Sequence, residues 1–207
     1  MRIEKIERSK RQQERILVFL EGADDPLRIT EDELLHFGLY TGLDIGPDTV
    51  VELQKCAARS QTRARAASMI SARPLSRKEL CRRLCEKGAE EADAEDAADW
   101  LERIGALDDL AYAKMLVRHY SASCCGRAKL REELYRRGVP RELWDEALAA
   151  APDPQETIGR FLAAKTKGQP TDERTRRKLA DALLRRGFSW GEVKESLAAL
   201  GETIEED

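Results

Sequence analysis

The side chains best suited to chemistry in this sequence are cysteines and a histidine at short spacings. Cys81 and Cys85 are four residues apart, and His119 lies shortly before the adjacent pair Cys124 and Cys125. Zinc sites usually offer closer ligand pairs and a clear fourth ligand. We therefore expect these thiols to be buried or bystander groups, and we predict neither a metal site nor a cofactor.

A pair of neighbouring carboxylates, Asp108 and Asp109, is the second candidate for chemistry. Such a pair could act in acid–base catalysis, but it follows Leu107 at a position where a helix N-cap is expected. The only histidines are His36 and His119, and the GxxxxGK[ST], GxGxxG and HExxH motifs are missing from the sequence. We therefore expect that this protein is not an enzyme.

The most distinctive pattern is a basic motif, called here the template, which the chain repeats three times. It reads Arg, two residues, Leu, three residues, Leu, two residues, Lys or Arg, Gly and an apolar residue. The copies are SRKELCRRLCEKGA (Ser76–Ala89), GRAKLREELYRRGV (Gly126–Val139) and TRRKLADALLRRGF (Thr175–Phe188). On a helix the leucines share one stripe, and the glycine suits the left-handed residue that ends a helix. The template therefore predicts a packed helix that stops at its glycine.

The arginines Arg77, Arg127 and Arg176 that begin the template need a separate explanation. We expect them in the first helical turn, where the helix dipole disfavours a cation. They could pair with carboxylates of the same fold, or they could contact an acidic surface or a phosphate outside it. The sequence leaves both alternatives open.

Charge along the chain is arranged in alternating blocks, although the net charge is only −3. Residues 55–87 hold ten Lys or Arg against two Glu, whereas residues 88–109 hold nine acidic residues against one Arg. Such blocks can cancel within one folded body, or they can present a basic face to a polyanion.

The elements that position these side chains are expected to be mainly helices, since charged residues are 36% and aromatic residues only 5%. In residues 1–46, RILVFL and LRI predict a hairpin, MRIEKIE adds a short third strand, and Thr30 with Glu33 predicts a capped helix that stops at Gly38. After Pro47, glycines and prolines delimit nine predicted helices in three sets. Their ranges are 48–72, 76–87 and 91–104; 108–121, 127–137 and 141–150; and 155–165, 172–186 and 191–200. The template lies on the middle helix of each set.

The helices that follow the three template glycines argue against a DNA-reading module. They are acidic or neutral, and each contains one Lys or Arg and no Asn or Gln, whereas a recognition helix needs several such side chains at base edges. Trp100, Trp144 and Trp190 fall in these helices, and we interpret them as core residues. The charged start of the chain and its short apolar run, Ile16–Leu20, fit neither a signal peptide nor a membrane-spanning helix. Reduced thiols in the cytoplasm are expected.

The ordered series of motifs resembles the RecX family, bacterial modulators of the RecA recombinase. The series is LSRKELCRRLCEKG, GALDDLAYAKMLVRHY, GRAKLREELYRRGV and LADALLRRGFSWGEVKESL, and VFLEGADDPLRITEDELLHFGLYTGLDI is similar to the opening of longer members. The match covers nearly the whole chain. It departs at Ala106, where the family usually has an aromatic residue, and the third copy of the template is the loosest.

This resemblance implies a mainly α fold of three tandem three-helix repeats forming a curved, elongated body, preceded by a small β-hairpin and a short helix. It implies four parts: the hairpin region 1–46, repeats 47–106 and 107–151, and a third repeat with an acidic tail, 152–207. It implies a cytoplasmic, monomeric regulator that binds the RecA–DNA filament and mainly inhibits its ATPase, strand exchange and coprotease activity. The alternative is a general DNA-binding protein, of single or double strands, that competes with the recombinase for DNA.

The resemblance implies no catalytic residues, and it carries over only candidate contacts. These are the basic residues of the matching motifs: Arg77, Lys78, Arg82, Arg83, Arg127, Arg131, Arg136, Arg176, Arg177 and Arg185.

Overall fold

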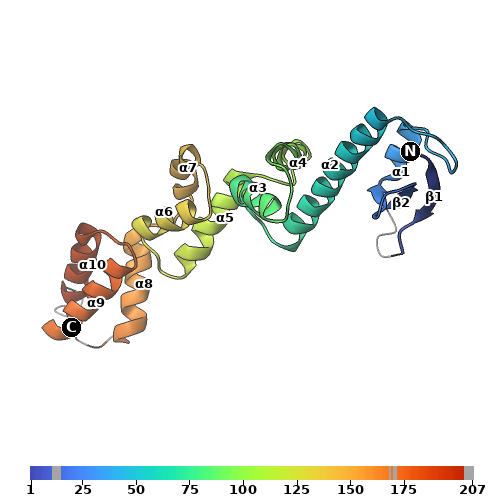
Figure 1. The fold of residues 1–207 in the computed structure, drawn as a ribbon. Helices are drawn as coiled ribbons and strands as arrows, with labels where there is room; N and C mark the ends of the chain where they lie inside the picture. The colour runs from blue at the N-terminus through green and yellow to red at the C-terminus, as the bar shows by residue number, and fades with distance from the viewer. Residues whose placement is uncertain (11–14, 168, 170–171, 203–207) are drawn as a thin grey trace. The chain divides into compact units, whose positions relative to one another are not determined.

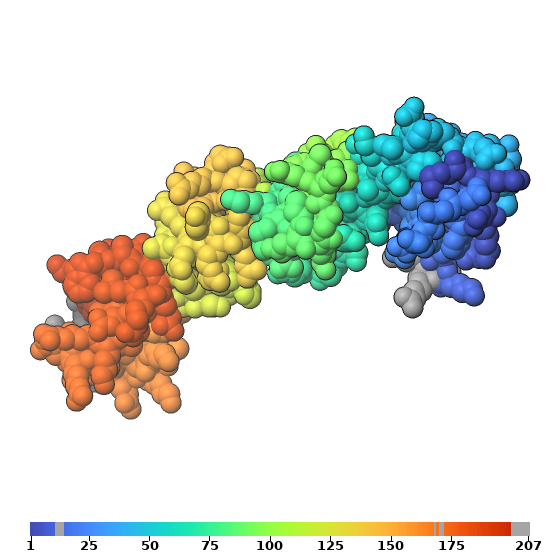
Figure 2. Space-filling view, viewed as in Figure 1, coloured from blue at the N-terminus to red at the C-terminus, as the bar shows by residue number. Residues whose placement is uncertain are grey.

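A computed structural model describes residues 1–10, 15–167, 169 and 172–202 of the chain (Figure 1). The chain divides into two compact units. Unit 1 comprises Met1–Pro74 with Glu79–Leu107, and unit 2 comprises Leu75–Lys78 with Asp108–Asp207. Within each unit, side chains fill the space between the elements (Figure 2). The acidic tail predicted at the C-terminus, residues 203–207, lies outside the described residues.

A small antiparallel sheet opens the chain, as the β-branched runs predict. Its strands, hydrogen-bonded in the order β1-β2-β3, are β1 (Ile3–Arg8), β2 (Ile16–Leu20) and β3 (Leu27–Ile29). Thr30 and Glu33 form the predicted capping box at the start of α1 (Glu31–His36). The guanidinium of the buried Arg15 donates to the hydroxyl and the carbonyl of Ser60, both at 2.7 Å, and so ties the sheet to the next helix. The predicted hairpin, third strand and short helix are confirmed.

Three sets of helices follow, in the order that the glycines and prolines predict. The first set is α2 (Pro47–Ala72), α3 (Arg77–Glu86) and α4 (Glu91–Arg103). The second is α5 (Asp109–Ala122), α6 (Arg127–Arg136) and α7 (Trp144–Leu148), with the 3-10 turn η1 (Arg141–Leu143) before α7. The third is α8 (Pro154–Thr166), α9 (Glu173–Arg185) and α10 (Trp190–Glu202). The tandem three-helix repeats are therefore confirmed, although the single helix predicted for 141–150 is a 3-10 turn and a short α-helix.

The template occupies α3, α6 and α9, and its leucines are core residues in every copy. The buried pairs are Leu80 and Leu84, Leu130 and Leu134, and Leu179 and Leu183. The second and third pairs belong to two separate apolar clusters, one inside each repeat. The three template glycines all have positive φ, between 72° and 86°. The helix-and-stop interpretation of the template is thus confirmed.

The carbonyl immediately before each template glycine accepts a hydrogen bond from the preceding part of the chain. The carbonyl of Lys87 accepts from the Arg65 guanidinium at 3.0 Å. The carbonyl of Arg137 accepts from the Ser76 hydroxyl, and that of Arg186 accepts from the Gly126 N–H at 2.8 Å. We call the second and third of these contacts the repeat joints, because each fixes the start of one template helix on the end of the next.

The joint between α6 and α9 is made of backbone alone. Besides the Gly126 contact, the N–H of Ala128 donates to the carbonyl of Gly187 at 3.1 Å. A Cβ atom on Gly126 would lie 2.4 Å from the carbonyl carbon and oxygen of Gly187, and a Cβ on Gly187 would lie 2.4 Å from the Lys129 nitrogen. Both positions therefore require glycine, since the two backbones approach too closely for a side chain.

Among the described residues, no helix combines the length and the apolar character needed to cross a membrane.

Candidate partner-binding surface

Among the described residues, at least five of the ten candidate basic residues form ion pairs with carboxylates of their own repeat. Arg82 pairs with Glu86, and the other pairs are Arg83 with Glu79 at 2.9 Å, Arg131 with Asp145 at 4.0 Å, Arg136 with Glu133 at 2.8 Å and Arg177 with Glu173 at 2.9 Å. Most of these pairs are exposed, and exposed pairs contribute little to stability, about 0–1 kcal/mol. Their charges are therefore partly neutralised within the fold but stay accessible.

The first-turn arginines have different surroundings in the three copies. At the start of α3, the backbone N–H of Arg77 donates to the Asp109 carboxylate at 2.8 Å. A carboxylate at this helix end offsets the unfavourable placement of a cation in the first turn. Arg127 begins α6, whose first turn contains no acidic residue. Arg176 is not in the first turn, because α9 begins at Glu173 with Asp172 as its N-cap.

The two neighbouring carboxylates of the sequence serve as helix caps. Asp108 caps α5, accepting from the N–H of Ala111 at 2.9 Å. Asp109 instead reaches the start of α3, as described above. The capping interpretation is confirmed for Asp108 at α5, and Asp109 accepts a hydrogen bond at the start of a second helix, α3.

The side chains of three of the ten candidates have no hydrogen bond or ion pair anywhere in the described part of the chain. They are Lys78, Arg127 and Arg185, all of them exposed. Lys78 and Arg127 belong to the starts of α3 and α6, and Arg185 ends α9. These cations are free to contact an anionic group from outside.

Sequence reasoning missed two further cations on α9. Arg174 and Lys178 are exposed, and with Arg185 they fall within an arc of about 40° on the helix. Asp181 shares this ridge. Both residues lie within the predicted helix 172–186, so the sequence places them on this helix without singling them out.

A few large apolar side chains of unit 2 are exposed. Tyr135 on α6 is 66% exposed, Leu184 on α9 is 38% exposed and Trp190 at the start of α10 is 60% exposed. The interpretation of Trp190 as a core residue is therefore wrong, whereas Trp144 is half-buried and donates its indole N–H to the Val139 carbonyl at 3.0 Å. Single exposed apolar side chains are common on protein surfaces, and only a contiguous group of them marks a contact site.

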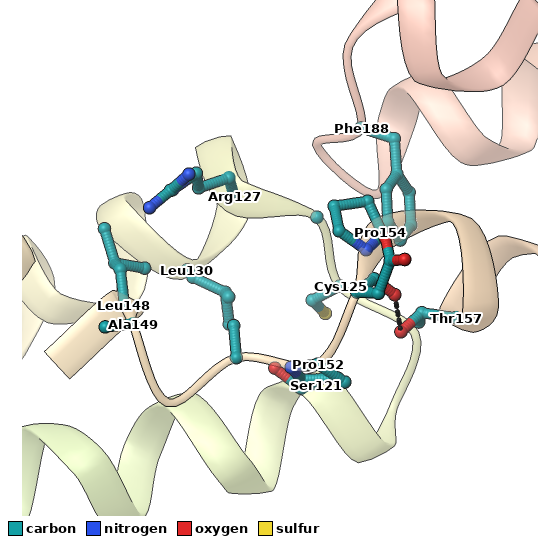
Figure 3. A pocket seen from close by; sticks show the side chains of 13 residues that line it. Ser121, Cys125, Arg127, Leu130, Leu148, Ala149, Pro152, Pro154, Thr157 and Phe188 are labelled. Carbon is teal, nitrogen blue, oxygen red and sulfur yellow. Dashed lines mark hydrogen bonds between the residues drawn. The ribbon is translucent and has the colours of Figure 1, made fainter. Parts of the chain in front are cut away.

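A cavity of about 230 Å³ lies between the second and third repeats, within unit 2 (Figure 3). The apolar walls come from Leu130, Leu148, Pro152 and Phe188. The buried hydroxyl of Ser121 has no hydrogen-bond partner among the residues that the structure describes. Phe188 belongs to the turn after α9, so the cavity adjoins the joint between α6 and α9.

The thiols beside this cavity are poorly suited to nucleophilic chemistry. Burial raises the pKa of both Cys124 and Cys125, although the positive charge of Arg186 acts in the opposite direction. Thiols with raised pKa values stay protonated at neutral pH, and only the thiolate is a good nucleophile. Among the described residues, no group of three or more His, Cys, Asp or Glu side chains could hold a metal ion.

Comparison with known proteins gives consistent matches. A family model described as the first three-helix domain of RecX matches residues 63–101, and one described as the second three-helix domain matches residues 108–148. The chain is 37% identical over 132 residues to the regulatory protein RecX of Xanthomonas axonopodis pv. citri (strain 306), covering 63% of this chain and 82% of that protein. It is 33% identical over 150 residues to the regulatory protein RecX of Chlorobium limicola, covering 70% of this chain and 93% of that protein.

Two crystal structures have a similar fold. One, of a regulatory protein RecX, gives a TM-score of 0.68 at 21% identity and covers 100% of this chain and 99% of its own. The other, of RecX from Lactobacillus salivarius, gives 0.62 at 20% identity and covers 70% of this chain and 97% of its own.

Proposed function

Since this chain belongs to the RecX family of regulatory proteins, we propose that it binds the RecA–DNA filament and regulates it. The main effect is inhibition of RecA ATPase, strand exchange and coprotease activity in DNA repair, recombination and the SOS response. The chain acts as a cytoplasmic monomer, with residues 1–46, 47–106, 107–151 and 152–207 as its four parts.

The observation that carries this proposal is the repeat joint. At both joints, the carbonyl immediately before the template glycine accepts a hydrogen bond. The carbonyl of Arg137 accepts from the Ser76 hydroxyl, and the carbonyl of Arg186 accepts from the Gly126 N–H. A chain built from equivalent steps presents equivalent side chains at regular intervals. Such a surface suits a polymer whose identical subunits also recur at regular intervals.

Regulation by this chain requires binding and no chemistry of its own. Asp108 and Asp109 are occupied as helix caps. Burial raises the pKa of the Cys124 and Cys125 thiols, which disfavours the nucleophilic thiolate.

A second candidate function is general DNA binding with competition for the recombinase's DNA. The unpaired cations Lys78, Arg127 and Arg185 favour it, because phosphate groups attract such side chains. The whole set of ten basic residues named from the sequence belongs to this candidate surface, and the unpaired three are its best members.

The RecA ATPase on single-stranded DNA separates the two functions when DNA is in excess over both proteins. We expect inhibition that persists as DNA is added, because the filament itself is the target. Inhibition that disappears with added DNA would support competition instead. Unchanged ATPase at every ratio of this chain to RecA, with the chain shown to be folded, would refute the regulatory proposal.

A further inference from the structure

Every copy of the template has an apolar residue directly after its second leucine. These residues are Cys85, Tyr135 and Leu184. The preceding leucine is buried in each copy, whereas this position faces solvent: Cys85 is exposed, and so are Tyr135 and Leu184. Packing of the repeat therefore does not account for an apolar residue here, although the position is apolar three times.

In the two copies of unit 2, an exposed arginine directly follows the exposed apolar residue. Arg136 follows Tyr135, and Arg185 follows Leu184. Arg131 lies one turn before Tyr135 on α6, and Arg185 has no partner among the described residues. Each position thus combines an exposed apolar side chain with an adjacent arginine, although Arg136 also pairs with Glu133 at 2.8 Å and a carboxylate, Glu132 or Asp181, lies three residues before each apolar side chain. An arginine beside an apolar side chain is complementary to an acidic surface that contains an apolar pocket.

The kind of partner follows from what tyrosine and leucine share. Tyrosine can stack on a nucleic-acid base, but leucine has no π-face with which to do so. Both are bulky apolar side chains with few rotatable bonds, and such side chains fit apolar pockets on protein surfaces. Protein interfaces concentrate their binding energy in a few such anchors surrounded by polar contacts.

The joint between α6 and α9 fixes how these two positions are spaced. It consists of two backbone hydrogen bonds, from Gly126 to Arg186 at 2.8 Å and from Ala128 to Gly187 at 3.1 Å. No side-chain rotamer can alter this contact. Tyr135 and Leu184 therefore occupy the same template position on two helices that are joined through their backbones.

We propose that Tyr135 and Leu184 are equivalent anchors that insert into apolar pockets of an acidic protein surface, one anchor for each of two successive repeats. This rests on the proposed function, because the surface is that of the recombinase filament. The arginines Arg136 and Arg185 meet the acidic rim of each pocket.

The test compares Tyr135→Ser, Leu184→Ser and the double variant with Met115→Ser. Met115, on α5, is 40% exposed and lies outside the template, so it controls for the loss of an exposed apolar side chain. Binding is measured by co-sedimentation with RecA filaments assembled on single-stranded DNA, and separately by fluorescence anisotropy on the bare DNA. Thermal unfolding checks that each variant is folded, which we expect because surface substitutions rarely disturb a fold.

We expect the dissociation constant for the filament to rise about tenfold or more for Tyr135→Ser and further for the double variant. Met115→Ser should change it less than about twofold. Tyr135→Leu should bind the filament nearly as the wild type does, because it keeps an apolar side chain without the aromatic ring.

If the Tyr135→Ser and Leu184→Ser variants bind the filament with wild-type affinity, the two residues are not anchors, and the proposed function is unaffected. An equal loss of affinity for bare DNA, with no rescue by Tyr135→Leu, would show that the position contacts bases and would also overturn the proposal. Failure of the wild-type chain to bind the filament would refute the proposed function and the anchors together.

Discussion

The hydroxyl of Ser76 donates a hydrogen bond to the main-chain carbonyl of Arg137, which lies 61 residues later in the sequence. Ser76 is buried immediately before α3, and Arg137 is the residue after α6. The equivalent carbonyl of the next copy, that of Arg186, accepts from the Gly126 N–H instead. A hydroxyl thus donates to the template carbonyl at one joint, and a backbone amide donates to the equivalent carbonyl at the next.

Replacing Gly187 by alanine should destabilise the protein much more than the same change at Gly88. Both residues have a φ of 86°, so both variants lose about 1–2 kcal/mol from the left-handed backbone. Only at Gly187 does the added Cβ also meet the backbone of Lys129, whereas nothing lies within 4 Å at Gly88. Urea unfolding of the two variants measures the difference, which we expect to exceed about 1 kcal/mol. Equal losses of unfolding free energy in the two variants would mean that the joint between α6 and α9 does not contribute to stability.

Ser76→Ala should cost about 1–3 kcal/mol in the free energy of unfolding, because it removes a donor from a partly buried carbonyl. Ser123→Ala is the control, since Ser123 is an exposed residue at the end of α5. Its effect should stay within about 0.5 kcal/mol. Denaturant unfolding followed by circular dichroism suffices, and a Ser76→Ala variant as stable as the wild type would contradict the importance of this hydrogen bond.

The start of α9 should lose stability in acid. Hydrogen bonds from the hydroxyl and the N–H of Thr175 hold the pKa of the Asp172 carboxyl below its ordinary value of about 3.9. Because the folded pKa is lowered, the stabilising contribution is complete above the unfolded value and is lost as the pH falls through the folded one. NMR titration of the carboxyl carbon should give a midpoint below about 3.9. In Asp172→Asn, which keeps a capping oxygen, the acid-dependent part of the helix stability should vanish.

Thiol labelling should distinguish the adjacent cysteines from the exposed Cys85. Burial raises the pKa of Cys124 and Cys125, so less thiolate is available there at neutral pH. Iodoacetamide labelling of the folded protein, read by peptide mass spectrometry, should therefore modify Cys85 first. In denaturant, Cys85, Cys124 and Cys125 should be labelled at similar rates. Faster labelling of Cys125 than of Cys85 in the folded state would contradict the burial of that thiol.

The local structure was predictable because its causes are local. Two leucines four apart, a basic residue and a glycine determine where α3, α6 and α9 pack and stop, and Thr30 with Glu33 determines where α1 begins. The repeat joints were not predictable, because they bring together residues such as Ser76 and Arg137 that no periodicity relates.

The errors at the candidate surface have the same origin. Trp190 was interpreted as core because tryptophan usually is, but α10 begins at this residue and leaves it exposed. The expectation of Arg176 in a first turn follows from aligning the template copies and conflicts with the predicted range 172–186, which the N-cap at Asp172 confirms. The exposure of a side chain depends on the elements packed around it, and the start of a helix depends on its N-cap. An alignment of the three template copies shows neither of them.

Reversing the charge of Arg127 should separate stability from binding. Arg127 is the first residue of α6, whose first turn has no acidic side chain, so Arg127→Glu places a negative charge where the helix dipole favours it. The free energy of unfolding should rise by about 0.3–1 kcal/mol while affinity for the partner falls. Arg28→Glu on β3 is the control, because Arg28 is an exposed basic residue away from the template.

The salt dependence of the same variant identifies what Arg127 contacts. If the contact is a phosphate of duplex DNA, the slope of log affinity against log salt should become shallower by about 0.9. If the contact is a carboxylate of the filament protein, affinity for bare DNA should be unchanged while affinity for the filament drops. A variant that is more stable yet binds both partners as the wild type does would remove Arg127 from the surface, and the first-turn arginine would then have no partner outside the fold.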